Sequence, residues 1–207
     1  MALVKYNNNS ISAVTSASSI PSGALTHIKT LTASSSATLS FVDGSYGVVL
    51  DSTYPIYKFE FINIHPSATS TFQFNMSTDG GSTYAVTKTT TAFRAFHTES
   101  DSGSGLGYVA GIDLAQSTAF QDLATDSSGT DNDSGISGTL QLFNPSSTTY
   151  VKHFMSNTNS VKTDSEAKNI YIAGYGNTTS SIDAVRFQMS SGNIDAGTIK
   201  LYGIKDS

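Results

Sequence analysis

The stretch IYKFEFINI, residues 56–64, decides the fold class. Three aromatic residues stand at alternate positions with charged residues between them: Tyr57, Phe59 and Phe61. Alternation with a period of two, in aromatic and β-branched residues, is typical of a strand with one buried face. It places Asn63 on the aromatic face and Ile64 on the opposite one. Pro55 and Pro66 bound the strand, because proline cannot donate to a sheet ladder.

Similar short segments follow one another along most of the chain. Further strand candidates lie at residues 25–33, 37–43, 70–77, 84–96, 136–144, 149–157, 168–176, 183–190 and 198–204. Turn residues separate them, and the strand–helix rhythm of a parallel sheet is absent. We therefore predict an all-β fold, an antiparallel β-sandwich that is jelly-roll-like. At most one short helix is expected, over DLAQSTAFQDLAT at 113–125.

Residues 1–24 differ from the rest, because they are rich in Ser, Asn and Ala and show no apolar period. We predict an extended N-terminal arm there and a single sandwich domain at 25–207. Five apolar side chains could be buried by such an arm on a neighbouring molecule: Leu3, Val4, Tyr6, Ile11 and Val14. A floppy terminus is the alternative interpretation of the same composition.

The amino-acid composition argues against several classes of function. The 207 residues include no cysteine, which excludes disulfides and thiolate chemistry. Charged residues make up 13%, the net charge is −5, and the 11 basic residues are spread thinly, so we expect no nucleic-acid partner. No apolar run is long enough for a transmembrane helix, and the first residues lack the apolar core of a secretory signal. We expect no membrane insertion.

The sequence shows no arrangement typical of catalysis. The four histidines are far apart and lack the spacing of a helical metal site: His27, His65, His97 and His153. No Gly-x-Ser-x-Gly elbow or phosphate-binding glycine loop is present. We therefore predict no catalytic residues, no cofactor site, no metal site and no enzymatic activity.

Four acidic residues between 122 and 133 are candidate ligands of a calcium loop: Asp122, Asp126, Asp131 and Asp133. An EF-hand that starts at Asp131 would need a glutamate at its twelfth position, where Leu142 stands. Solvated loop acids are the default interpretation. A calcium site of another type stays open.

The segment STDGGSTY, residues 77–84, predicts a hairpin between the strands on either side, because glycine supplies the positive φ of tight turns. Its spacing Ser77-x-Asp79-x-Gly81-x-Thr83-Tyr84 resembles the Asp-box of sialidases, in which the Asp side chain satisfies turn amides. Sialidases carry that motif repeatedly and this chain carries it once. We interpret it as a turn-stabilising motif, without glycosidase activity.

Tyrosine side chains are the remaining candidates for ligand binding, because aromatic rings stack on sugars. Five were considered: Tyr108, Tyr150, Tyr171, Tyr175 and Tyr202. We select Tyr108 and Tyr175 as candidate sugar-facing aromatics. The loop-rich region 99–135 is where a β scaffold usually carries its binding surface. Packing within the sheet is the alternative for each ring.

The block IDAVRFQMSSGNIDAGTIKLYGI, residues 182–204, resembles the carboxyl end of a family of small β-sandwich virion proteins of tailed bacteriophages. Phages of marine bacteria carry them most frequently. The resemblance extends to YKFEFINIHP (57–66), FQFNMSTDGGSTY (72–84) and LFNPSSTTYVKHF (142–154).

This resemblance implies a structural protein located in the virion, without enzymatic activity. It favours capsid decoration or a small head or tail appendage that docks on other virion proteins through the N-terminal arm. A homo-oligomer is expected, with a trimer favoured. The alternative is a glycan-binding receptor module at a fibre tip, with a host surface glycan as its partner.

Overall fold

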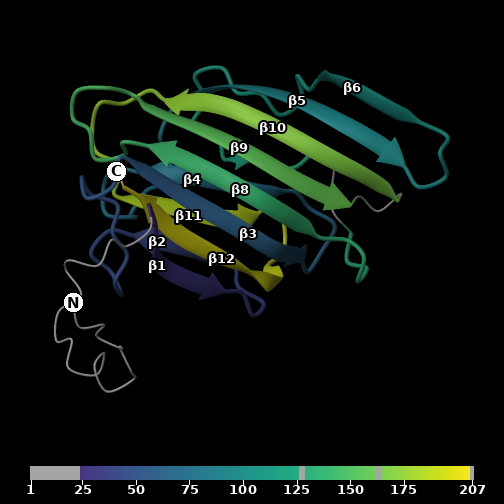
Figure 1. Cartoon of the computed structure of the whole chain (residues 1–207), viewed down its shortest axis with the longest axis horizontal. Coiled ribbons are helices and arrows are strands. Elements are labelled where there is room, and N and C mark those ends of the chain that lie inside the picture. Colours follow the sequence, from purple (N-terminus) through teal and green to yellow (C-terminus); the bar gives the residue numbers. More distant parts are fainter. Residues whose placement is uncertain (1–23, 126–128, 162–164, 206–207) are drawn as a thin grey trace, which may run out of the picture.

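The computed structural model describes residues 24–125, 129–161 and 165–205, which form two packed β-sheets. The large sheet has the order β1 (Leu25–Thr32), β12 (Ile194–Ile204), β3 (Ile56–Pro66), β8 (Ile136–Phe143), β9 (Lys152–Val161), β10 (Glu166–Gly176), β5 (Lys88–Thr98), β6 (Ser104–Tyr108). The small sheet has the order β2 (Thr38–Val42), β11 (Ala184–Met189), β4 (Phe72–Ser77), β7 (Gln121–Asp122). In Figure 1 the large sheet lies in front of the small one.

The strand pairs are nested along the chain. β1 pairs with β12, β2 with β11, β3 with β8 and β4 with β7, and every pair is antiparallel. Successive pairs lie in alternate sheets, which is the connectivity of a jelly roll. Two further hairpins, β5–β6 and β9–β10, widen the large sheet beyond the small one. The predicted antiparallel, jelly-roll-like sandwich is confirmed.

Phe187 on β11 is the centre of the core. Its ring lies within 6.4 Å, centroid to centroid, of five other phenylalanine rings: Phe41, Phe59, Phe61, Phe72 and Phe74. Two of these rings come from β3 of the large sheet and three from the small sheet, and none is more than 2% exposed. The alternation predicted at positions 57, 59 and 61 is therefore the inner face of β3.

A bulge in β3 overturns the prediction for the end of that strand. The register to β8 shifts between Phe61 and Ile64, and Asn63 takes a positive φ of 49°. The extra residue turns the strand over, so Ile64 is fully buried and Asn63 is exposed. A strict period of two assigned both side chains to the wrong faces.

The segment 113–125 forms no helix, and no helix occurs anywhere in the described residues. It runs along β5 instead, where Ser117 and Lys88 exchange backbone hydrogen bonds of 2.8 and 3.0 Å. Its last part forms β7 beside β4. An isolated helix of three turns is marginal in water, so pairing with two strands is the more favourable use of these backbone groups.

The Asp-box-like turn is stabilised as predicted, but it does not form a hairpin. Asp79 Oδ1 accepts the Ser77 hydroxyl at 2.7 Å and the Thr83 amide at 2.8 Å, and these bonds lower the Asp79 pKa. Gly81 has a φ of 80°, and a Cβ there would lie 2.7 Å from the Tyr84 hydroxyl. However, β4 and β5 belong to different sheets, so the turn carries the chain across the sandwich.

The segment SSGN, residues 190–193, connects β11 of the small sheet to β12 of the large sheet. Gly192 takes a φ of 69° in the connection between β11 and β12. The Asn193 amide donates to Ser67 Oγ at 2.8 Å, and the Ser67 amide donates to the Asn193 carbonyl at 3.0 Å. Ser67 lies between β3 and β4, so the turn ties together two connections that cross between the sheets.

We expect Phe187→Ala to lower the free energy of unfolding by about 3–5 kcal/mol, because it opens a cavity between the two sheets. The matched control is Phe93→Ala, which removes a phenylalanine that is 45% exposed and should cost about 1 kcal/mol or less. Denaturant unfolding followed by circular dichroism measures both. Equal losses for the two variants would contradict the central place of Phe187.

Candidate functional site on the open sheet face

The outer side of the large sheet is a broad face that the small sheet does not cover (Figure 1). Side chains alternate along each strand, so every second residue points outward. The strand registers align one row of outward residues across the sheet: Lys200, Glu60, Thr139, Asn157, Tyr171, Phe93 and Tyr108. The row is charged at its β12 end and aromatic at its β6 end.

The aromatic end of this row is preorganised. Phe93 and Tyr171 stack with ring centroids 4.9 Å apart and planes 9° from parallel. Tyr108 lies opposite Phe93 in the register, and its hydroxyl donates to Asp113 Oδ2 at 2.6 Å. Five large side chains form what we call the exposed apolar face: Phe93 (45% exposed), Leu106 (76%), Tyr108 (59%), Met155 (57%) and Tyr171 (41%).

A shallow apolar groove of about 460 Å³ adjoins this face. Its outward-facing lining includes Thr89, Thr91, His153, Met155, Ala173 and Tyr175. The Tyr175 ring lies 6.2 Å from the His153 ring, and its hydroxyl is 3.5 Å from the Gln116 side-chain amide. The groove exists because small residues of β5 and β10 lie between larger neighbours.

Both selected tyrosines point to this face. Tyr108 ends the aromatic row, and Tyr175 is a half-buried residue at the groove. Tyr171 and Phe93, which continue the row from Tyr108, are not among the sugar-facing aromatics predicted from the sequence. The alternation of TYVKHFMSN and KNIYIAGYG was visible in the sequence, but the pairing of β10 with β5, which stacks the two rings, was not. The arm residues Leu3, Val4, Tyr6, Ile11 and Val14 lie outside the described residues.

A second, polar cavity of about 570 Å³ opens where β3 and β12 both bulge. Its polar lining includes Asn63, His65, Asp133, Ser137, Asn159 and Asp195. The acids of the 122–133 loop do not gather here: Asp133 lines the cavity, while Asp122 is bound by the Gln73 amide at 2.6 Å, and burial raises its pKa. Asp126 lies outside the described residues.

Within the residues that can be described, no three or more His, Asp or Glu side chains gather in a way that could hold a metal ion. The four histidines lie apart. His27 contacts the Thr30 hydroxyl, His65 the Asp131 carbonyl and His97 the Asp101 carboxylate, while His153 stands at the groove. The described part of the chain contains no helix capable of spanning a membrane.

Three lysines are buried on the inner side of the widened sheet, a burial that no sequence pattern predicts: Lys88, Lys152 and Lys168. Lys168 pairs with Glu166 at 3.0 Å, and Lys152 donates to the Tyr150 carbonyl at 2.7 Å. Lys88 Nζ contacts the side-chain oxygen of Asn75 at 2.5 Å and the Val86 carbonyl at 2.8 Å. Burial lowers the Lys88 pKa to about 7.

No protein-family model, curated protein or solved structure matches the chain. The candidate function therefore depends on the geometry of the open face and on the sequence resemblance.

We expect Lys88 to make stability pH-dependent. Its pKa is about 7 in the folded protein and about 10.4 in the unfolded chain, so unfolding between these values takes up a proton. The free energy of unfolding should therefore rise with pH above 7, by up to about 1.4 kcal/mol per pH unit from this residue.

The test compares the wild-type chain with Lys88→Met in denaturant unfolding at pH 7, 8 and 9. The stability of the wild type relative to this variant should increase along the series. Phe93→Ala, which changes no charge, is the control and should differ from the wild type by a constant amount. A constant difference for Lys88→Met as well would show that Lys88 keeps its proton in the core.

Proposed function

We propose that the protein is a non-enzymatic structural subunit of a phage particle, a capsid decoration protein or a small head or tail appendage. The observation that carries this proposal is the exposed apolar face, where five large side chains lie open on one sheet. Contiguous exposed apolar surface of this kind marks an interaction site. An interaction surface is what a subunit of a particle needs.

The resemblance supports the same conclusion in structural terms. Its most specific block, residues 182–204, forms β11, β12 and the turn that closes the sandwich. The residues that carry the resemblance therefore lie in the strands and the turn that complete the jelly roll, a fold that viral capsid and lectin domains use. Decoration needs such a stable scaffold, with residues 1–24 as its attachment to other virion proteins.

Deletion of residues 1–24 should abolish incorporation into particles while the sandwich stays folded. Quantitative mass spectrometry of purified particles measures the copy number, and circular dichroism of the free protein checks the fold. The control is a full-length chain with Tyr150→Ala, an exposed tyrosine in the loop between β8 and β9. Normal incorporation of the truncated chain would refute docking through the arm, and absence of the full-length protein from particles would refute the function itself.

A second candidate function is glycan binding, as in a receptor module. The stacked pair Phe93 and Tyr171, with Tyr108 beside it, presents a flat aromatic surface, and Asn157 follows in the same row. Sugar rings pack against aromatic faces while amide side chains bind their hydroxyls. Under this proposal the partner is a host surface glycan.

Tyr171→Ala should then weaken binding of a glycan at least about tenfold, which is 1.4 kcal/mol, because it removes half of the stacked pair. A glycan array identifies the ligand, and titration calorimetry compares the variants. Tyr150→Ala is the matched control and should bind like the wild type. No binding by the wild-type protein at high concentration, with and without calcium, would refute this candidate function.

A further inference from the structure

Strand β6 is an edge strand whose outer backbone groups have no partner strand among the described residues. The large sheet ends at β6, which pairs with β5 on one side only (Figure 1). Gly103 accepts from the Thr98 amide at 2.9 Å, and the Val109 amide donates to Ala92 at 3.0 Å. Backbone groups of an antiparallel strand alternate between its two sides.

This alternation fixes which groups are free. Residues 103, 105, 107 and 109 direct their N–H and C=O groups toward β5. Ser104, Leu106 and Tyr108 therefore direct theirs away from the sheet. These three residues also carry the exposed side chains of β6, and the residues between them are glycines.

Two other sheet edges in the described part of the chain, β1 of the large sheet and β7 of the small sheet, carry protective features that β6 lacks. β1 has a register shift between His27 and Lys29, and Lys29 Nζ donates to the Tyr46 carbonyl in the loop that lies between β2 and β3. β7 has only two residues. Bulges, lysines, short strands and covering loops are the usual means of blocking edge-to-edge pairing. The SGLGY sequence of β6 has no charge, no proline and no bulge.

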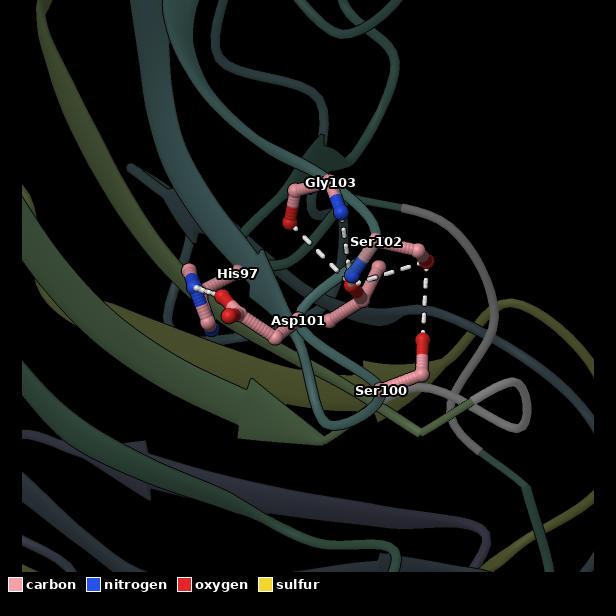
Figure 2. A network of polar contacts seen from close by, with 6 residues as sticks. His97, Ser100, Asp101, Ser102 and Gly103 are labelled. Atoms are coloured by element: carbon pink, nitrogen blue, oxygen red, sulfur yellow. Dashed lines mark hydrogen bonds and ion pairs between the residues drawn. The ribbon is translucent and has the colours of Figure 1, made fainter.

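The turn before β6 holds the strand in place. Figure 2 shows the side chains of this turn directed toward one another. Thr98 Oγ1 accepts the amides of Ser102 and Gly103 at 3.0 and 2.9 Å, and His97 pairs with Asp101 at 3.2 Å. An edge that is already ordered loses little conformational entropy when it binds.

We propose that β6 is a self-association site, at which two copies of the chain pair their β6 strands in antiparallel fashion about a two-fold axis at Leu106. Leu106 then exchanges hydrogen bonds with the partner's Leu106, and Ser104 exchanges them with the partner's Tyr108. The nearest acids, Asp101 and Asp113, already have partners in their own chain, at 3.2 and 2.6 Å.

The symmetry follows from the edges available. A two-fold axis needs only one self-complementary edge, whereas a closed ring of three needs two different edges that fit each other. Because β1, the other edge of the large sheet, is blocked, the geometry favours a dimer over the trimer expected from the resemblance. Pairing would also place the two exposed apolar faces on the same side of one continuous sheet. This inference is independent of the proposed function, because it concerns only self-association.

Sedimentation velocity of the full chain over a wide concentration range tests the proposal. The wild type should form dimers, and hydrogen exchange of the peptide that contains residues 104–108 should slow as concentration rises. Leu106→Pro removes the amide at the two-fold axis and no bond to β5, so it should be monomeric. Leu106→Lys keeps the backbone but opposes two like charges, and should raise the dimer dissociation constant at least about tenfold.

Met155→Lys is the matched control, because it places the same charge on the same exposed face but far from the edge. It should dimerise like the wild type. A wild type that stays monomeric or forms trimers overturns the proposal, and so does a dimer that Met155→Lys disrupts and Leu106→Lys does not. If Leu106→Pro fails to fold, as seen by circular dichroism, Leu106→Lys decides the outcome.

Discussion

The contact of Phe187 with phenylalanines from both sheets is the interaction on which the rest of the structure depends. Each nested strand pair joins residues far apart in the chain, with Leu25 beside Ile204 as the extreme case. Forming such a pair costs loop-closure entropy before the contacts between its strands add any stability. A buried aromatic cluster offsets that cost where the pairs meet, because β3, β4 and β11 all reach it.

Widening of the large sheet creates a second constraint. β9, β10 and β5 extend past the small sheet, so their inner side needs another cover. The segment 109–125 provides it: the Thr90 hydroxyl donates to Gln121 at 2.7 Å, and the Thr158 hydroxyl donates to the Leu123 carbonyl. Polar groups elsewhere hold the lysines of this inner side: Lys88 donates to Asn75 and to the Val86 carbonyl, and Lys152 donates to the Tyr150 carbonyl. The outer side of the sheet remains the face open to partners.

Local patterns predicted the strands well and their partners poorly. The alternation at 57–61 identified an inner face that is fully or almost fully buried. The turn chemistry at Asp79 was also visible, but its neighbour strands separate into two sheets because β4 pairs with β11 instead. β6 was not predicted, because Gly103, Gly105 and Gly107 make this segment resemble a loop. The stacked aromatic pair depended on a long-range register that no local pattern encodes.

Charged and apolar side chains are separated along the outer face of the large sheet. The row that ends in Phe93 and Tyr108 begins with Lys200 and Glu60, and most of the exposed large apolar side chains of the large sheet lie at its β6 end. That end is also where the unprotected edge lies. Apolar side chains and free backbone groups thus coincide at β6, and a single partner could satisfy both.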